Sequence, residues 1–187
     1  MPDKETQIIE TAIRLFAEEG TSVPTSKIAK EAGVSNGTLF NYFPTKQDLI
    51  DSVFFFIKEK MANHIMTEVN FEADIKDMLH ETWRILILWA ADHPLEDEVV
   101  NVLKISQVLS DDVREASEHF FAAIYEALEN SMKDNIIIEI PVDFLCDLSA
   151  AYLRGTVSYA RNNDIEKDEL EQLIDMSFEI YWNGIKT

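Results

Sequence analysis

Cysteine is almost absent from this sequence, because Cys146 is the only one among 187 residues. A single thiol cannot form an intrachain disulfide, and a zinc finger, which needs several ligands of this kind, is excluded as well. Long apolar runs are also missing, since the longest, Ile85 to Ala91, is far too short to cross a bilayer. The initial segment MPDKETQ has no apolar signal core either, so we expect a cytoplasmic protein with no membrane partner.

Glycine and proline are scarce, with five residues of each. Gly20 and Gly33 lie where helices should end, while Pro24 and Pro44 lie where a helix should break or begin. Hydrophobic residues make up 47% of the chain, which is enough to bury a core. Because there is also no linker rich in glycine or serine and no internal repeat, the sequence predicts an all-α protein.

Hydrophobic periodicity predicts a long helix that starts at Lys46. Further helices are expected over residues 71–92, 95–109, 111–132, 141–161 and 168–185. Ser110, followed by two aspartates, is a suitable N-cap for the third of these. The segment 136–140 has a β-like composition, and we interpret it as a buried connection.

Basic residues are outnumbered, with 16 Lys and Arg against 35 Asp and Glu, for a net charge of -19. Such acidity argues against a nucleic-acid partner, because affinity for DNA comes largely from neutralising phosphates. The acidic residues are unevenly distributed, however. Residues 1–63 hold 7 basic and 9 acidic residues, which leaves 9 against 26 for the remainder. Within residues 21–47, Lys27, Lys30 and Lys46 are opposed by Glu31 alone, so DNA binding is compatible with this composition.

The segment from Thr25 to Lys46 has the pattern of a helix-turn-helix. Ile28 and Ala32 lie at helical spacing, and Gly33 can take the left-handed conformation that a sharp turn requires. Ser35 is then a suitable N-cap for a second short helix. In this motif the second helix enters the major groove of DNA.

The second helix would turn Leu39 and Phe43 inward, because they lie four residues apart. Its other residues are short or polar, so they suit hydrogen bonds to base edges and contacts with thymine methyl groups. The candidate DNA contacts here are Ser35, Asn36, Gly37, Thr38, Phe40 and Asn41. Taken alone, the same pattern also fits a capped surface helix.

Lys46 favours the DNA-binding interpretation. Thr45 and Asp48 form the pattern of a capping box, which places Lys46 at the first position of the next helix. A cation beside the positive end of a helix dipole costs about a few tenths of a kcal/mol. A bound phosphate would reverse that sign, because backbone N–H groups and the ammonium would converge on one anion.

Residues from about Thr6 to Phe55 resemble the DNA-binding domain of the TetR family of transcriptional regulators. The matching features are Ile9, Ala12, Phe16 and Gly20, then IAKEAGVS from Ile28 to Ser35, GTLFNYF from Gly37 to Phe43, and Lys46. The resemblance covers the first third of the chain. It implies an N-terminal three-helix helix-turn-helix DNA-binding domain over residues 1–47 and a helical ligand-binding and dimerisation domain over residues 48–187. It also implies a ligand-responsive repressor that acts as a homodimer on a palindromic operator of double-stranded DNA.

The same resemblance assigns roles within the helix-turn-helix. The implied phosphate contacts are Thr25, Tyr42 and Lys46, and the implied base contacts are Ser26, Asn36, Gly37 and Thr38. Family members usually have tyrosine where this chain has Phe40, so a hydroxyl contact is missing here. Many also carry Lys or Arg at Asn36 or near Ser26, and their absence argues against a strong preference for guanine.

The last two expected helices carry more apolar surface than one core needs, so a second copy is the economical partner. A central helix inside one domain is the alternative. The predicted dimer interface consists of Leu148, Tyr152, Gly155, Leu173, Ile174, Ser177 and Tyr181. For the pocket of the small-molecule effector, which the resemblance implies, the candidates are Met78, Trp83, Trp89, Phe120, Phe121 and Tyr125. An aromatic stripe at helical spacing is more often core than ligand site.

Catalytic features are not apparent in the sequence. There is no glycine-rich phosphate loop and no HExxH, and the four histidines show no metal-ligand spacing. We therefore expect no enzymatic activity, no cofactor and no metal. Two alternatives to a regulator stay open: a helical protein-interaction module without sequence-specific DNA binding, and an enzyme with an aromatic-lined pocket.

Overall fold

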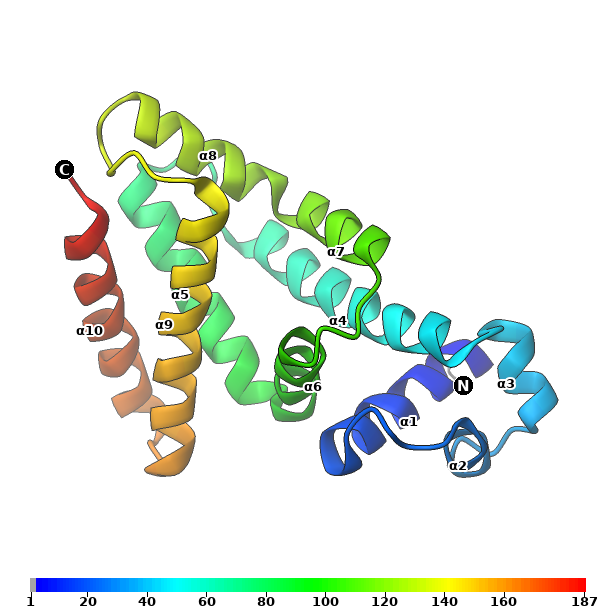
Figure 1. Cartoon of the computed structure of the whole chain (residues 1–187). Helices are drawn as coiled ribbons and strands as arrows, with labels where there is room; N and C mark the ends of the chain where they lie inside the picture. The colour runs from blue at the N-terminus through cyan, green and yellow to red at the C-terminus, as the bar shows by residue number, and fades with distance from the viewer. Residues whose placement is uncertain (1–2) are drawn as a thin grey trace. The chain divides into compact units, whose positions relative to one another are not determined.

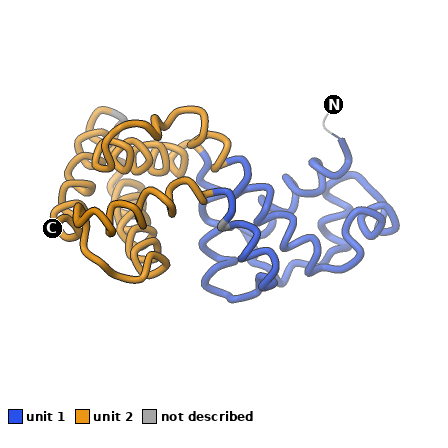
Figure 2. Tube along the Cα trace, turned by 90° about the horizontal axis from the view of Figure 1, so that it is seen from above, with its two compact units in different colours: residues 1–60, 93–120 blue, residues 61–92, 121–187 orange. Residues whose placement is uncertain are grey.

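The computed structural model describes residues 3–187, apart from the side chains of Glu118 and Lys167. Helices account for most of this range and no β-strand occurs in it, which confirms the predicted all-α class. The described residues contain one isolated antiparallel bridge, between Ile137 and Lys186. Two compact units can be distinguished, residues 1–60 with 93–120 and residues 61–92 with 121–187 (Figure 2).

These units differ from the predicted boundary after Gln47, because residues 48–60 and 93–120 group with the N-terminal helices. Helix α4 (Lys46–Glu68) contributes residues to both units. The division into a DNA-binding domain over 1–47, whose first two residues lie outside the described range, and a ligand-binding domain over 48–187 stays a prediction about function.

The first unit contains the three N-terminal helices, the first part of α4 and two later helices. These are α1 (Lys4–Glu19), α2 (Thr25–Glu31), α3 (Asn36–Tyr42), α6 (Pro94–Ile105) and α7 (Asp111–Glu118) (Figure 1). Asp3 caps α1 by accepting a hydrogen bond from the Thr6 N–H at 2.9 Å. Gly20 and Gly33 follow α1 and α2 with φ of 77° and 67°, a conformation that favours glycine. The local end signals of the sequence are thus confirmed.

Helix α1 packs against α6 and α2, and α2 packs against α3. Ile8 and Phe16 on α1, Val99 and Leu103 on α6 are all 0% exposed. Burial of an aliphatic or aromatic side chain of this size stabilises a fold by about 1.5–3 kcal/mol. This shared core supports the helices that carry the candidate DNA contacts.

The second unit contains the end of α4 and four further helices: α5 (Ile75–Asp92), α8 (Ala122–Lys133), α9 (Val142–Asn162) and α10 (Lys167–Ile185). Helices α5, α9 and α10 pack against one another, and α8 packs against α5 and α9 (Figure 1). An aromatic cluster lies in this core. The ring of Trp83 stacks on Tyr181 with centroids 4.7 Å apart and meets Phe178 edge-on at 6.0 Å.

Two ion pairs and one contact between a histidine and a carboxylate join α5 to α10, at intervals of four residues on each helix. Lys76 pairs with Glu179 at 2.6 Å and His80 with Asp175 at 2.9 Å. Arg84 makes a bidentate pair with Glu171 at 2.8 and 3.0 Å. The hydrogen bond from Lys76 lowers the pKa of the Glu179 carboxyl, and the one to Glu171 raises the pKa of Arg84. We refer to these three contacts as the ion-pair ladder.

Several predicted helix boundaries were wrong, for local reasons. The helix expected from residue 71 begins at Ile75, because Asp74 caps it by accepting the Lys76 N–H at 2.9 Å. The helix expected over 111–132 is interrupted by a 3₁₀ turn at His119–Phe121 before α8. The connection over 136–140 is buried at Ile137, which is 1% exposed, but its neighbour Ile136 is 43% exposed.

Candidate nucleic-acid interface

The N-terminus of helix α3 is capped by the side chain of Ser35. The Ser35 hydroxyl accepts a hydrogen bond from the Thr38 N–H at 3.0 Å, and it also lies 2.9 Å from the Thr38 hydroxyl. Leu39 and Phe43 are buried, at 0% and 2% exposure, which confirms them as the inward pair. The opposite face of the helix is therefore fixed in orientation and available to a partner.

The outward residues of α3 carry no basic group. Asn36, Gly37 and Asn41 are exposed, and Thr38 is half-buried. Phe40 and Tyr42 are large side chains that are 43% and 42% exposed. This face combines two side-chain amides, two exposed rings and a glycine that has no side chain. Such a surface can approach base edges and thymine methyl groups closely.

Gly37 is not required by the fold itself. A Cβ at this position would meet nothing closer than the Ser35 Oγ at 3.7 Å, which is an ordinary contact. Its backbone conformation also lies outside the left-handed region. Packing inside the protein therefore does not require glycine at this position. The missing side chain instead lets a partner approach the α3 backbone closely.

Lys46 is the first residue of α4, as the sequence predicted. The capping box is confirmed, since the Thr45 N–H donates to Asp48 Oδ2 at 2.8 Å and the Asp48 N–H donates to Thr45 Oγ1 at 3.1 Å. Within the described residues, Lys46 makes no hydrogen bond or ion pair. Its ammonium therefore combines with the positive end of a 23-residue helix and is available to an anion.

Other basic groups of this region are engaged inside the unit. Arg14 is hydrogen-bonded to Glu31, which lowers the pKa of the Glu31 carboxyl and raises that of the guanidinium. Lys27 pairs with Glu19, which raises the pKa of Lys27. These pairs tie α1 to α2. Lys30 is exposed, and it joins Lys46 as the positive charge that faces solvent around the motif.

The structure brings the predicted DNA contacts onto consecutive elements of one unit. Thr25 and Ser26 begin α2, half-buried and exposed respectively, and Pro24 precedes them without a side-chain cap. The contacts expected on α3 follow, and Lys46 begins the next helix. DNA contact by each of these residues remains a prediction.

The six residues predicted for the effector pocket are distributed over both units, and their role as ligand contacts remains a prediction. Trp83 belongs to the aromatic cluster of the second unit, where its Nε1–H donates to Ser177 Oγ at 3.0 Å. Phe120 groups with the first unit, where its ring lies 4.8 Å from that of Phe55. Trp89 is 3% exposed, so it is core as well. Phe121 and Tyr125, which are half-buried, do not line the cavity described next.

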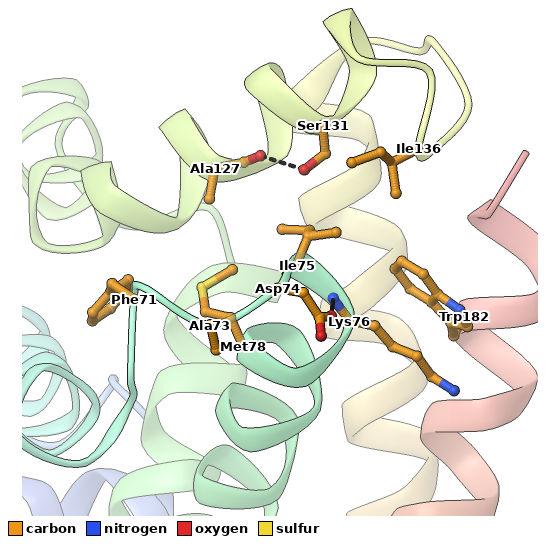
Figure 3. A pocket seen from close by; sticks show the side chains of 10 residues that line it. All are labelled: Phe71, Ala73, Asp74, Ile75, Lys76, Met78, Ala127, Ser131, Ile136 and Trp182. Carbon is orange, nitrogen blue, oxygen red and sulfur yellow. Dashed lines mark hydrogen bonds between the residues drawn. The ribbon is translucent and has the colours of Figure 1, made fainter.

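Met78, one of the predicted pocket residues, lines a cavity that has a volume of about 390 Å³ and lies within the second unit. The lining residues are Phe71, Ala73, Asp74, Ile75, Lys76, Met78, Ala127, Ser131, Ile136 and Trp182 (Figure 3). Sequence reasoning missed the others because they come from a loop, three helices and the connection over 136–140. No periodicity within one helix could have grouped them.

The predicted dimer stripe on α10 needs correction. Ile174, Ser177 and Tyr181 are 0%, 9% and 4% exposed, because they pack inside the second unit of the same chain. Leu173 is half-buried. These four residues were assigned to a partner-facing surface because α10 is apolar on two sides, but most of both apolar sides is buried within one chain.

Leu148, Tyr152 and Gly155, the predicted interface residues on α9, are exposed. Other large apolar side chains of α9 and α10 are exposed as well. The large side chains of these two helices that are at least 36% exposed are Phe144, Leu148, Tyr152, Tyr159, Met176 and Ile180. We refer to these six residues as the α9–α10 apolar face.

Comparison with known proteins agrees with this architecture. Residues 8–53 match the family described as bacterial regulatory proteins, tetR family, and this range includes α2, α3 and the start of α4. A solved structure from Shewanella sp. PV-4, described as a tetR family transcription regulator, covers 100% of both chains with a TM-score of 0.92 and 26% identity. Residues 8–53 thus match the DNA-binding part of tetR-family regulators.

Two further relatives differ in what their names say. The Fatty acid metabolism regulator protein of Bacillus subtilis (strain 168) is 37% identical over 112 residues, which cover 56% of this chain and 54% of that protein. The chain therefore matches only about half the length of this relative. The Nucleoid occlusion factor SlmA of Vibrio cholerae is 25% identical over 174 residues, which cover 90% of this chain and 86% of that protein.

Within residues 3–187, no helix has the length and apolar character to span a bilayer. The same range holds no group of three or more histidine, cysteine, aspartate or glutamate side chains placed to bind a metal ion.

Proposed function

We propose that this tetR-family regulator is a homodimeric, ligand-responsive repressor that binds a palindromic operator through residues 25–46. The observation that carries the proposal is the combination of an uncharged, exposed α3 face with Lys46 at the capped start of α4. One element offers groups for base edges, and the other offers a positive charge for a phosphate. A protein with this role would act in the cytoplasm, on DNA, and without catalysis.

The α3 face also indicates which bases are favoured. Asn36 and Asn41 can donate and accept the two hydrogen bonds that an adenine edge requires, and Phe40 can contact a thymine methyl group. Guanine is usually recognised by Arg or Lys, and α3 has neither. We therefore expect half-sites in which A·T pairs occupy the positions that α3 contacts.

Dimerisation is supported by the α9–α10 apolar face. A monomer rarely exposes a large apolar surface without a partner. On α9, Phe144, Leu148 and Tyr152 recur every four residues, which gives a stripe along one side of the helix. A second copy packed on the same face would form an isologous two-fold interface. Its two α3 helices would then contact half-sites about one helical turn of DNA apart.

Release from the operator would follow a population shift. An effector that binds better to one arrangement of the dimer favours that arrangement by its difference in affinity. Coupling of about 1–3 kcal/mol is typical of such systems and changes the affinity for DNA by roughly 5–150-fold. The arrangement favoured by the effector would present the two α3 helices at a spacing that no longer matches the half-sites.

The direct test is fluorescence anisotropy with the full chain and labelled duplexes, including the region upstream of its own gene, followed by selection from a random duplex pool. We expect selected sequences to be palindromic and rich in A·T pairs at the α3 positions. The dependence of affinity on salt should be shallow, because few phosphates are neutralised. A steep dependence, or selected guanines at the α3 positions, would contradict the assignment of contacts.

The alternatives predict different outcomes in the same assay. A helical interaction module would bind no duplex in the pool, whatever the salt concentration. An enzyme would be indicated by turnover of a small molecule, which a regulator does not require.

A further inference from the structure

The cavity of about 390 Å³ in the second unit falls within the size range of small-molecule sites, roughly 300–1,000 Å³. Its walls are mainly apolar. They consist of Phe71, Ala73, Ile75, Met78, Ala127, Ile136 and Trp182, which come from the α4–α5 loop, α5, α8, the following connection and α10 (Figure 3). Segments distant in sequence thus converge on one space.

The carboxylate, the ammonium and the hydroxyl of the lining are already engaged within the protein. Asp74 Oδ1 accepts the N–H groups of Lys76 and Asp77, at 2.9 and 3.2 Å, as the N-cap of α5. The Lys76 ammonium pairs with Glu179 at 2.6 Å, and in Figure 3 it extends away from Met78 and Ala127. Ser131 donates its hydroxyl hydrogen to the Ala127 carbonyl at 2.8 Å.

Because these polar groups already have partners within the protein, they limit what the cavity can bind. A charged or strongly polar group that enters an apolar space without new hydrogen bonds loses free energy, because its hydration is not replaced. An apolar group gains free energy from removal of its surface from water. The cavity therefore discriminates against a charge placed inside it, of either sign.

We propose that this cavity is the effector site and that it binds an uncharged molecule through an aliphatic chain that contacts Phe71, Ile75, Met78 and Trp182. The inference rests on the proposed function, because it gives the effector of the regulator a location and a chemical class. Any weakly polar group of the ligand lies at the open end, in solvent.

The site also lies beside the first pair of the ion-pair ladder. Lys76 lines the cavity through its stem while its ammonium holds Glu179 of α10, and Trp182 of α10 forms another part of the wall. A chain that fills the cavity thus contacts both α5 and α10. Since α10 contributes Met176 and Ile180 to the α9–α10 apolar face, occupancy and dimer geometry involve the same helix.

The test uses straight-chain alcohols as probes with the full-length protein in the absence of DNA. Butan-1-ol, hexan-1-ol and octan-1-ol are titrated by calorimetry, with tryptophan fluorescence as a second readout because Trp182 lines the cavity. We expect affinity to rise about fourfold for each added CH₂ group, as burial of aliphatic surface requires. Affinity that does not depend on chain length would overturn the proposal.

Two variants locate the site. Ala127→Phe fills the cavity, so octan-1-ol should bind at least tenfold more weakly. Ala122→Phe adds the same ring at an exposed position of the same helix, outside the lining, and should leave binding unchanged. Equal loss in both variants, or loss in neither, would place the alcohol elsewhere and refute the assignment.

Charged probes of the same chain length test the chemical class. Octanoate and octylammonium should both bind more weakly than octan-1-ol. Tighter binding of octanoate would show that Lys76 exchanges Glu179 for the ligand, and tighter binding of octylammonium would show that Asp74 acts as a counter-charge. Either result would overturn the uncharged class.

DNA binding, measured separately, distinguishes failure of this inference from failure of the proposed function. Alcohols that do not bind, together with a protein that binds an operator, would refute the site and leave the regulator intact. Alcohols that bind at the cavity of a protein that binds no duplex would refute the regulator and, with it, the effector role of the site.

Discussion

The backbone N–H of Ser110 donates a hydrogen bond to Oδ1 of Asp51 at 3.1 Å, although 59 residues separate them in sequence. Gln47 reinforces this contact, because its Nε2 donates to the same carboxylate oxygen at 3.0 Å and to the Val108 carbonyl at 2.8 Å. The first turns of α4, which begin at Lys46, are thereby fastened to the turn that precedes α7.

We predict that Asp51→Ala lowers the free energy of unfolding by about 1–3 kcal/mol, since the Ser110 N–H and the Gln47 amide both lose their charged acceptor. Urea denaturation followed by circular dichroism measures this change. Glu59→Ala, an exposed carboxylate on the same helix, is the control and should change stability by less than about 0.5 kcal/mol. Equal effects of the two substitutions would show that the contact contributes nothing.

Lys46→Ala should weaken binding to every duplex by a similar factor, because a phosphate contact carries no sequence information. The slope of log affinity against log salt should decrease by about 1. Lys60→Ala, on the same helix, is the control, since Lys60 already pairs with Glu96 at 3.4 Å. A change in sequence preference would show that Lys46 contacts bases.

Ser35→Ala should destabilise the start of α3, because the Thr38 N–H loses its acceptor. The expected cost is about 0.5–2 kcal/mol of stability, with a matching loss of operator affinity if α3 is the recognition helix. Ser22→Ala removes an exposed hydroxyl from the turn before α2 and serves as the control. Full operator affinity in a destabilised Ser35 variant would contradict the role of α3.

Lys58 makes stability depend on pH. Burial lowers the pKa of Lys58 from 10.5 to about 7, and the nearby charge of Lys104 adds to the effect. Between these two pH values the unfolded chain holds a proton that the folded protein has released, so the free energy of unfolding rises with pH from about 7 to 10.5. Lys58→Met should remove this rise, which is on the order of a few kcal/mol, and should stabilise the protein at pH 7. Denaturation curves recorded at pH 7 and pH 9.5 would show it. A rise of the same size in the variant would assign the dependence to another group.

Local features of this fold could be predicted from sequence because their causes are local. Ser35 caps α3, Thr45 and Asp48 form a capping box, and Gly33 ends α2, all with partners within a few residues. The candidate DNA contacts follow from these signals, since they fix which face of α3 is outward. Asp74 is an equally local signal for the start of α5. The apolar residues that precede it extend the hydrophobic pattern, so the predicted helix began too early.

Features that depend on distant contacts could not be predicted in this way. The periodicity of α10 shows two apolar sides, but it does not tell whether each one meets α5, α9 or another chain. Ser177 was therefore assigned to an interface, although it accepts a hydrogen bond from Trp83, 94 residues away. The cavity was missed for the same reason, because Phe71, Ile136 and Trp182 become neighbours only after folding.

The ion-pair ladder repeats every four residues on both helices, so charge alone does not specify one alignment of α10 on α5. If α10 slid by one turn, about 5.4 Å, Lys76 would face Asp175 and His80 would face Glu171. Two attractive pairs would therefore form in the shifted alignment. The hydrogen bond from Trp83 to Ser177 would be lost, because in that alignment Trp83 would face Leu173, whose side chain has no acceptor. The buried Ser177 hydroxyl thus distinguishes the observed alignment of this helix pair from one that the charges alone would tolerate.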